Sequence, residues 1–306
     1  MVLSMRTSVL LALLTVLSPV HAQEDDSPSN PKAAKAPTAK EIFQQAVAAQ
    51  GKLRPDDVRD LYVRFEGQVQ EKGQKTQSAT REYWLRPPDR SFRIKTTAGA
   101  DPSKPFSERG VLGTEQGAQR PEAYWESIKR QRTKLSRSNR DHRDVIKAIR
   151  RDRTEFERIV HMVLLVRLAN ADARISFAKP ARVRLEKDQP NSASAILGRD
   201  RKAEYWVLDV ARKNADPLRM FIRVDDSTVR KVIQFDLEEP DRIKTVSYFG
   251  FYRVNQQAGR MVLPQAFSVY SAVPDGKKGN EATMMVSGKL SIRINDNLDD
   301  STFAPK

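Results

Sequence analysis

The sequence predicts an α+β fold in which a strongly curved antiparallel sheet of about 10–11 strands, an unclosed β-barrel, has helices covering its concave face. Three observations predict it. Most of the expected elements are segments that alternate polar and apolar side chains, separated by turn signals at hairpin spacing. The alternation leaves one apolar face, as in an antiparallel sheet with one buried side. One long amphipathic helix, residues 140–169, interrupts the strands, and so large a one-sided sheet has to curl around helices, a ligand, or both.

Residues 1–22 have the composition of a signal peptide. Arg6 supplies the basic start, residues 9–16 the short apolar core, and Val20-His21-Ala22 the small residues that precede a cleavage site. The apolar core is too short to span a bilayer. We therefore expect export, cleavage after Ala22 and release as a soluble protein. Residues 23–39 should be a disordered leader of Pro, Ala, Ser and Lys without apolar anchors, and residues 40–306 a single domain.

The first part of that domain should contain one short helix and three strands. Residues 40–50 place apolar side chains on one helical face, Thr38 can cap the start, and Gly51 ends the helix. The period then changes to two in the expected strands 61–69, 76–85 and 90–96. Residues 99–117 are expected to be a loop with one weak strand near 109–113. Residues 124–140 are very basic and are expected to be irregular or weakly helical.

Residues 140–169 are expected to form one continuous helix. Apolar side chains recur there at three- and four-residue steps: Val145, Ile146, Ile149, Phe156, Ile159, Val160, Val163 and Leu164. Asp141 is the expected N-cap and Asn170 the expected stop. The second half has few polar residues, so it should be buried almost all round. Two interpretations stay open: the helix is simply the core helix of the domain, or it lines or lids a cavity.

The rest of the chain reads as an antiparallel meander. We expect strands at 174–177, 182–186, 204–211, 218–224, 229–237, 242–253, 260–270 and 282–295, with residues 188–201 as an exposed loop. Along several of these strands apolar residues alternate with polar or charged ones, which indicates a sheet with one apolar side.

The chain is strongly basic and has no cysteine. Its 54 Lys and Arg against 39 Asp and Glu give a net charge of +15. Without cysteine it has no disulfide, thiol nucleophile or thiolate metal site. Basic residues are frequent in a partly helical middle segment, residues 99–170, and on the long helix they include Arg143, Lys147, Arg150, Arg151 and Arg153. They form either a solvated helix face or a surface that docks on an anionic membrane or an acidic partner. Nucleic acid is disfavoured, because the segment lacks interleaved aromatic residues and the chain is expected to be exported.

Candidate catalytic residues are few, and we expect no enzyme activity, cofactor or metal site. Of the three histidines, His142 lies among charges and His161 in the buried half of the long helix, without metal-ligand spacing. The acidic pairs fall at turn positions, where Asp is common for backbone reasons: Asp225-Asp226, Glu238-Glu239 and Asp299-Asp300. No catalytic serine motif, glycine-rich phosphate loop or dinucleotide fingerprint occurs.

A candidate ligand cavity follows from the apolar faces of the strands and of the helix. The side chains expected to face one common apolar space are Phe92, Val163, Leu164, Met220, Ile222 and Met284. Met and aromatic side chains are normally core, but they also adapt well to disordered acyl chains. The space is therefore either filled core or a site for apolar ligands.

The order of elements resembles the LolA-like family of periplasmic outer-membrane lipoprotein carriers and sorting proteins. Residues 39–96 carry a helix ending in glycine, two strands and a turn, Pro88-Asp89-Arg90, into a third strand. Residues 204–306 carry Leu263-Pro264 in the penultimate expected strand and an acidic end with Phe and Pro: Asp299, Asp300, Phe303 and Pro305. The resemblance implies a periplasmic protein whose unclosed barrel holds acyl chains under its helices. The chain departs from the family in its basic middle, residues 99–140, and the family's functional arginine has no assignable counterpart.

These observations together predict a soluble, exported, non-enzymatic carrier. It would bind the acyl chains of a lipoprotein or lipid between the curved sheet and the long helix, as in outer-membrane lipoprotein sorting. The alternative from the same fold is an envelope sensor or scaffold that binds proteins and has a filled core.

Overall fold

The computed structural model describes residues 36–71, 75–98, 106–114, 122–128, 131–169, 172–184, 196–197, 203–213, 215–272 and 282–304. The chain divides into two units, Met1–Ala36, of which only Ala36 is described, and the compact unit Pro37–Lys306. All elements below belong to the second unit. The expected signal peptide and residues 23–35 of the expected leader lie outside the described residues, so both remain predictions.

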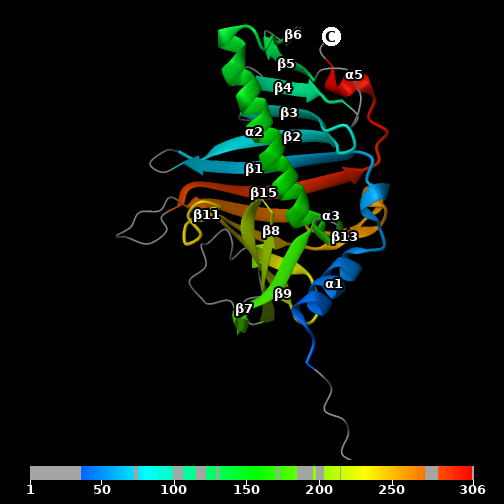
Figure 1. Cartoon of the computed structure of the whole chain (residues 1–306), viewed down its shortest axis with the longest axis vertical. Helices are drawn as coiled ribbons and strands as arrows, with labels where there is room; N and C mark the ends of the chain where they lie inside the picture. Colours follow the sequence, from blue (N-terminus) through cyan, green and yellow to red (C-terminus); the bar gives the residue numbers. More distant parts are fainter. Residues whose placement is uncertain are drawn as a thin grey trace, which may run out of the picture. The chain divides into compact units, whose positions relative to one another are not determined.

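One antiparallel sheet of 13 strands dominates the second unit (Figure 1). Its order is β6-β5-β4-β3-β2-β1-β15-β14-β11-β10-β9-β8-β7, so it has two edges, β6 and β7, and is not closed. Its first half consists of β1 (Leu61–Glu71), β2 (Gln77–Arg86), β3 (Ser91–Ala98), β4 (Phe106–Leu112), β5 (Ala123–Ile128) and β6 (Gln131–Lys134). Its second half consists of β7 (Ala173–Arg184), β8 (Glu204–Arg212), β9 (Ala215–Arg223), β10 (Val229–Phe235), β11 (Ile243–Gly250), β14 (Ala266–Ala272) and β15 (Ala282–Ile294). The predicted fold class is confirmed, with more strands than the expected 10–11.

The two halves meet where the first strand pairs with the last. Strand β1 is antiparallel to β15 from Leu61 opposite Ile294 to Glu71 opposite Met284. Gly67 faces Gly288 in the middle of this pair. A Cβ atom on Gly67 would lie 2.0 Å from the Ser287 carbonyl oxygen, and one on Gly288 would lie 2.1 Å from that of Glu66. Only glycine allows the two backbones to approach so closely at this joint.

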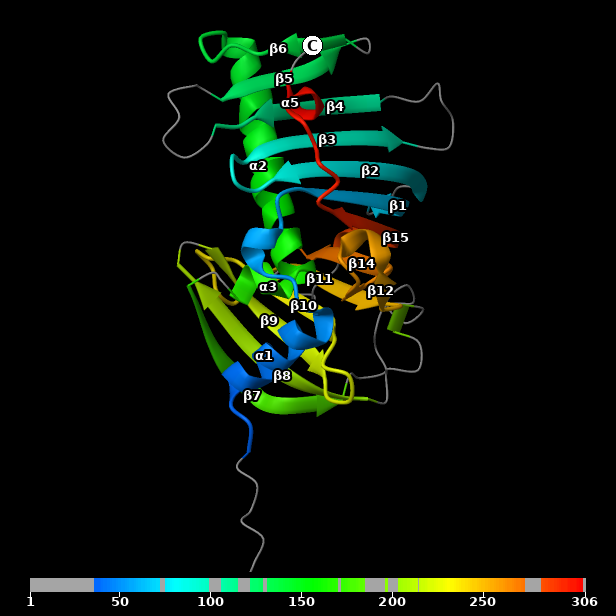
Figure 2. The same ribbon diagram turned by 90° about the vertical axis from the view of Figure 1, so that its right-hand side faces the viewer.

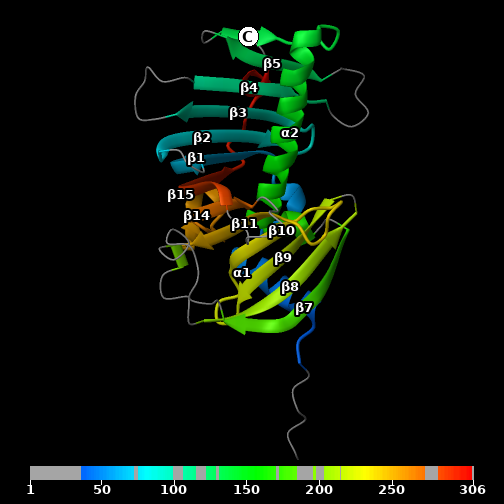
Figure 3. The ribbon, with the colours of Figure 1, turned by 90° about the vertical axis from the view of Figure 1, so that its left-hand side faces the viewer.

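The chain has to cross the sheet between β6 and β7, because these consecutive strands lie at its two opposite edges. Helix α2 (Arg140–Val163) follows β6 and leads towards β7. Figures 2 and 3 show α2 running along one face of the sheet from the β6 edge to its middle. We call the face that α2 covers the inner face. Helices α1 (Ala39–Gln50) and α3 (Leu165–Ala169) pack on the same face, within one hydrophobic core.

Local signals explain where the helices begin. Thr38 and Glu41 form the capping box of α1, and Gly51 follows its last residue, as predicted. The N-cap of α2 is Asn139, whose side chain accepts a hydrogen bond from the Asp141 amide at 2.9 Å. The prediction of Asp141 as the cap was wrong. Asp141 lies in the first turn, where its negative charge interacts favourably with the positive end of the helix dipole.

The expected continuous helix 140–169 is two helices. Leu164 leaves helical geometry, with φ −107° and ψ 85°, and separates α2 from α3. Gln50 of α1 occupies the break: its side-chain amide donates to the Val163 carbonyl oxygen at 2.7 Å and accepts from the Leu165 amide at 2.9 Å. The expected stop, Asn170, lies outside the described residues.

Several predictions about the strands were wrong. The segment expected to be irregular or helical, 124–140, contains strands β5 and β6 before α2 begins. Tyr124 and Trp125 are both buried, at 1% and 0% exposure, so β5 has two covered faces and no polar-apolar alternation. The expected strands 174–177 and 182–186 are one strand, β7, with a register shift between Phe177 and Arg182.

The expected strands 242–253 and 260–270 are each divided in two. Besides β11 and β14, they contribute a separate two-stranded sheet of β12 (Arg253–Asn255) and β13 (Met261–Leu263). Pro264 follows β13 directly and lacks the backbone N–H that continued pairing needs. Phe251 lies between β11 and β12 with a φ of 53° and is 57% exposed.

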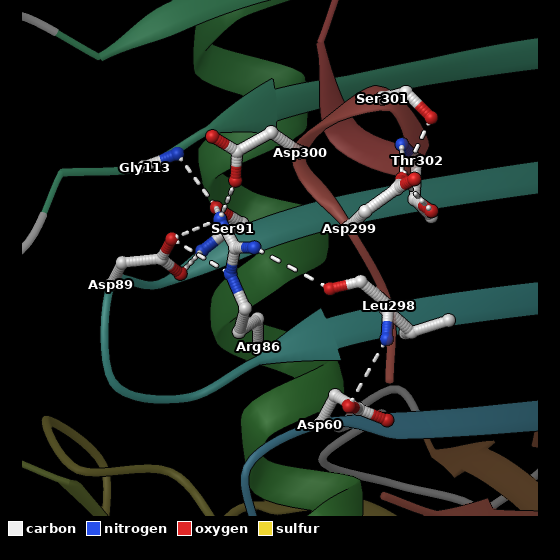
Figure 4. Close-up of polar contacts among 10 residues, drawn as sticks. All are labelled: Asp60, Arg86, Asp89, Ser91, Gly113, Leu298, Asp299, Asp300, Ser301 and Thr302. Atoms are coloured by element: carbon white, nitrogen blue, oxygen red, sulfur yellow. Dashed lines mark hydrogen bonds and ion pairs between the residues drawn. The ribbon is translucent and has the colours of Figure 1, made fainter. Parts of the chain in front are cut away.

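The C-terminal segment crosses the outer face of the first half and ends in helix α5 (Asp300–Phe303). Figure 4 shows Arg86 of β2 between Asp89 and Asp300, at 2.8 and 2.6 Å. The Phe303 ring lies under the Arg86 guanidinium, 5.2 Å from it. Just before α5 in the chain, the backbone amides of Asp296 and Leu298 donate hydrogen bonds to Asp60. The Pro-Asp-Arg turn and the acidic C-terminal end, on which the family resemblance rests, are therefore joined in space.

Candidate ligand cavity

A cavity of about 160 Å³ lies between the middle of the sheet and the C-terminal half of α2. From the helix, Phe156, Ile159, Met162 and Val163 face it. Their spacing of three, three and one residues places them on one side of α2. Phe156 is held by its neighbours: its ring stacks on Tyr83 of β2 with centroids 4.4 Å apart and lies 5.9 Å from the ring of Phe92.

The sheet contributes apolar side chains from both of its halves. Phe65 of β1 and Phe267 of β14 pack with ring centroids 4.6 Å apart and both line the cavity. The other apolar lining residues of the sheet are Val63, Tyr83, Ile94, Phe249, Val269, Val286 and Leu290. Several of these, Tyr83 and Val269 among them, are only half buried. The cavity is therefore partly open to solvent.

Polar groups line the cavity at several points. Asp152 of α2 receives two hydrogen bonds from Arg109 of β4, from Nε at 2.9 Å and from a terminal nitrogen. Gln234 of β10 donates to Asp216 at 2.7 Å and accepts from Thr245 at 3.1 Å. Ser247 and Arg81 complete the polar part of the lining.

The structure brings most of the predicted cavity residues into one core but only one of them to the cavity. Phe92, Val163, Leu164, Met220 and Ile222 share the main hydrophobic cluster. Val163 lines the cavity, and Leu164 borders a void of about 10 Å³ that Val163 also lines. Phe92, Met220 and Ile222 are at most 1% exposed and do not line either space. The side chain of Met284 lies outside the described residues.

The sequence did not predict most of the lining residues, because residues that line a cavity show the same periodicity in the sequence as residues that fill the core. Phe65, Ile159 and Phe267 alternate or repeat like their fully buried neighbours, so periodicity selects the correct face without showing where packing is incomplete. The size of the space also differs from the expectation. An apolar cavity of about 150 Å³ takes a ligand the size of benzene, so the observed one does not hold several acyl chains without rearrangement.

The first half of α2 is fixed to the sheet by a cluster of charges around Glu122, which precedes β5. Arg153 donates to Glu122 at 3.0 Å and to the Arg90 carbonyl oxygen at 3.1 Å. Tyr124 also donates to Glu122, and Arg150 donates to the Tyr124 hydroxyl at 2.7 Å. Burial by itself would raise the pKa of the Glu122 carboxyl, but the hydrogen bonds from Tyr124 and Arg153 outweigh it and lower that pKa.

This cluster corrects one predicted docking residue. Arg153 is 5% exposed and bound to Glu122, so it cannot contact a membrane surface. The other four predicted residues are exposed on α2: Arg143, Lys147, Arg150 and Arg151. Of these, Lys147 lies 3.3 Å from Asp144, and Arg150 takes part in the Glu122 cluster.

His142 and His161 each contact a neighbouring side chain or backbone group. His142 accepts a hydrogen bond from the Ser136 amide at 3.0 Å, and His161 lies 2.7 Å from Arg212. Among the described residues there is no group of His, Cys, Asp or Glu side chains that could hold a metal ion. In the same part of the chain, no helix combines the length and apolar character needed to cross a membrane.

No family model and no curated protein matches the sequence. Among solved structures, the chain is similar to a LolA superfamily protein from Nitrosomonas europaea, with 11% identity and a TM-score of 0.46 over 88% of this chain and 98% of that one. It is also similar to a DUF1329 family protein from Desulfovibrio piger, with 10% identity and a TM-score of 0.45 over 88% and 98% of the two chains. A third is an outer membrane lipoprotein-sorting protein domain from Vibrio parahaemolyticus, with 10% identity and a TM-score of 0.43 over 86% and 94%. At 10–11% identity these likenesses concern the fold alone.

Proposed function

We propose that this chain is an exported, non-enzymatic carrier that binds an acyl chain of a lipoprotein or lipid between α2 and the sheet. The observation that supports the proposal is the half-open cavity itself, lined by Phe65, Phe267, Ile159 and other apolar side chains. Such a site needs no catalytic group, because each methylene moved from water into it contributes about 0.8 kcal/mol. The proposal includes a periplasmic location and removal of residues 1–22.

A full acyl chain requires the cavity to grow, and α2 is the element that can give way. Its C-terminal half covers the cavity with apolar side chains, and it ends at the break at Leu164. A displacement of this half away from Phe65 and Phe267 would lengthen the space without disturbing the pairing of β1 with β15. Loading and release would then be a change in the position of one helix.

Filling the cavity should abolish binding of an acyl probe. An indole is larger than benzene, which fits a cavity of about 150 Å³, so Val269→Trp should place a ring where the ligand would lie. We expect the dissociation constant of a fluorescent fatty acid to rise about tenfold or more, the equivalent of roughly two methylenes no longer buried. Val254→Trp is the matched control, because Val254 is 52% exposed and does not line the cavity.

Equal binding by both tryptophan variants and the unchanged protein, with cooperative unfolding intact in all three, would contradict the carrier proposal. The alternative function would then gain: an envelope sensor or scaffold that binds proteins through the same fold. The small size of the cavity favours that alternative. Native mass spectrometry of protein extracted gently from its envelope separates the two, because a carrier should retain a lipid-sized mass. The mass of the protein itself reports whether cleavage after Ala22 has occurred.

The exposed basic side chains of α2 support a second, weaker contact with an anionic membrane surface. Each would contribute about 1 kcal/mol, screened by salt. We expect Arg143→Glu with Arg151→Glu to reduce co-sedimentation with vesicles that contain anionic lipid, at low salt more than at high salt. Arg174→Glu with Lys179→Glu makes the same change of net charge at exposed positions of β7 and should have less effect. The same loss in both double variants would leave only a general charge effect.

A further inference from the structure

Arg81 of β2, which is half-buried, differs from six other arginines whose Nε atom is also buried. The Nε atoms of seven described arginines are buried without a hydrogen-bond partner: Arg81, Arg93, Arg153, Arg212, Arg223, Arg230 and Arg242. Six of them bind a neighbour through another guanidinium nitrogen, as Arg93 does with Glu108 at 2.6 Å and Arg230 with Asp226 at 3.0 Å. Within the described part of the chain, the guanidinium of Arg81 makes no hydrogen bond and no ion pair.

Arg81 also lies where a ligand would lie. It lines the cavity together with Phe65, which lies opposite it on β1, and Tyr83, which lies two residues further along β2. The carboxylate that lines the same cavity, Asp152, is held by Arg109 and makes no ion pair with Arg81 among the described residues. Because Arg109 and Asp152 compensate each other, the charge of Arg81 is left without a counter-charge in a lining whose other side chains are apolar or are neutral and polar.

An arginine in this position is suited to one class of ligand. A half-buried cation without a counter-ion has lost part of its hydration, so it gains from an anion that enters with the ligand. Its planar fork matches the two oxygens of a carboxylate or phosphate. Ligand sites are commonly apolar with a few polar groups that set orientation. Here the apolar part would hold a tail and Arg81 the head.

We infer that the cavity binds a single-chain anionic amphiphile, with its tail between α2 and the sheet and its carboxylate or phosphate head on Arg81. The inference rests on the proposed carrier function and narrows it. A ligand of this class differs from a neutral acyl chain in requiring the guanidinium. It also matches the size of the space better than several chains do, because one tail is the least volume an acyl ligand can bring.

A head-group series tests the inference on the full mature chain. Dodecanoate, dodecyl phosphate, dodecan-1-ol and dodecyltrimethylammonium share one tail, and inorganic phosphate has none. A hydrogen-bonded charge pair contributes about 1.5–3 kcal/mol, which corresponds to a factor of about 10–100 in the dissociation constant. We expect both anions to bind tighter than the alcohol by this factor, the ammonium compound to bind weakest, and inorganic phosphate alone not to bind.

Substitutions at Arg81 should remove the preference and leave the tail site. Arg81→Met should weaken binding of dodecanoate and dodecyl phosphate by the same factor of about 10–100 and leave dodecan-1-ol unchanged. Arg81→Lys keeps the charge without the fork and should keep part of the preference. Arg64→Met is the matched control: Arg64 lies on the neighbouring strand β1, is exposed and pairs with Glu66. Thermal unfolding of each variant shows whether it is folded.

The outcomes separate this inference from the carrier function. If all four heads bind with equal affinity, or if Arg81→Met does not change the series, the anionic class is wrong while the carrier stands. If inorganic phosphate binds as tightly as dodecyl phosphate and depends on Arg81, the site takes a free anion and the amphiphile is wrong. If no tail binds to the unchanged protein, the carrier function fails. If Arg81→Met does not fold, the head-group series on the unchanged protein and on Arg81→Lys still tests whether the site prefers anions.

Discussion

Phe156→Ala should lower the free energy of unfolding by about 3–5 kcal/mol, the range for removing a buried aromatic side chain. Phe156 is 1% exposed and packs face to face on Tyr83, with Phe92 beside both. It is the main apolar contact of the middle of α2 with the first half of the sheet, beside the Arg109–Asp152 ion pair. Chemical denaturation monitored by tryptophan fluorescence measures the change, since Trp84 and Trp125 lie on this half of the sheet.

The control is Phe251→Ala. Phe251 is 57% exposed, and its removal should change stability by no more than about 0.5 kcal/mol. A loss below about 1 kcal/mol for Phe156→Ala, a value typical of an average substitution, would mean that α2 does not depend on this contact. Because Phe156 also lines the cavity, the same variant should enlarge the space. It is therefore expected to bind dodecanoate tighter while being less stable, a combination that general damage to the fold would not produce.

The strands and the face of the long helix were predictable because they depend on local periodicity. In β9 and β10, side chains alternate between the inner core and the other face, and the period of two is visible in the sequence alone. Strand β5 was not predictable in this way. Tyr124 faces the charges of α2 and Trp125 faces the C-terminal segment, where it donates to the Phe303 carbonyl oxygen. A partner 178 residues away leaves no local mark.

The basic side chains of α2 also could not be sorted into exposed and buried from the sequence alone. Arg151 and Arg153 are two residues apart, carry the same charge and have similar neighbours in sequence. One is exposed and the other is buried against Glu122, 31 residues earlier. Nothing in the sequence indicated Arg81 as a site residue, since single arginines are common on strands. Only the absence of a partner for its guanidinium among the described residues makes it a candidate.

The break in the long helix was not predicted either, although one residue indicated it. Gln50 lies on the apolar face of the first helix, among Ile42, Phe43 and Ala46, where a polar side chain needs a partner. Its partners are the two backbone groups exposed by the break at Leu164, 113 and 115 residues away. A glutamine can satisfy both because its amide carries a donor and an acceptor. The break and the glutamine therefore belong together.

Gln50→Leu should destabilise the protein by about 2–6 kcal/mol, because it leaves two buried backbone groups without partners at about 1–3 kcal/mol each. Gln50 is 4% exposed, so water has little access to replace the amide. Gln45→Leu, an exposed position of the same helix, is the matched control and should change stability by no more than about 0.5 kcal/mol. The Leu165 amide should also exchange its hydrogen faster in Gln50→Leu than amides in the middle of β1 and β15 do.

The same variant tests whether the break is the point about which α2 moves. If it is, loosening the break should raise the rate at which dodecanoate enters and leaves the cavity, since none of the lining side chains has changed. The rates, measured by stopped-flow fluorescence, should rise together and leave the affinity close to that of the unchanged protein. Unchanged rates in a destabilised Gln50→Leu protein would show that Gln50 holds the helices in place but that ligand entry does not pass through this break.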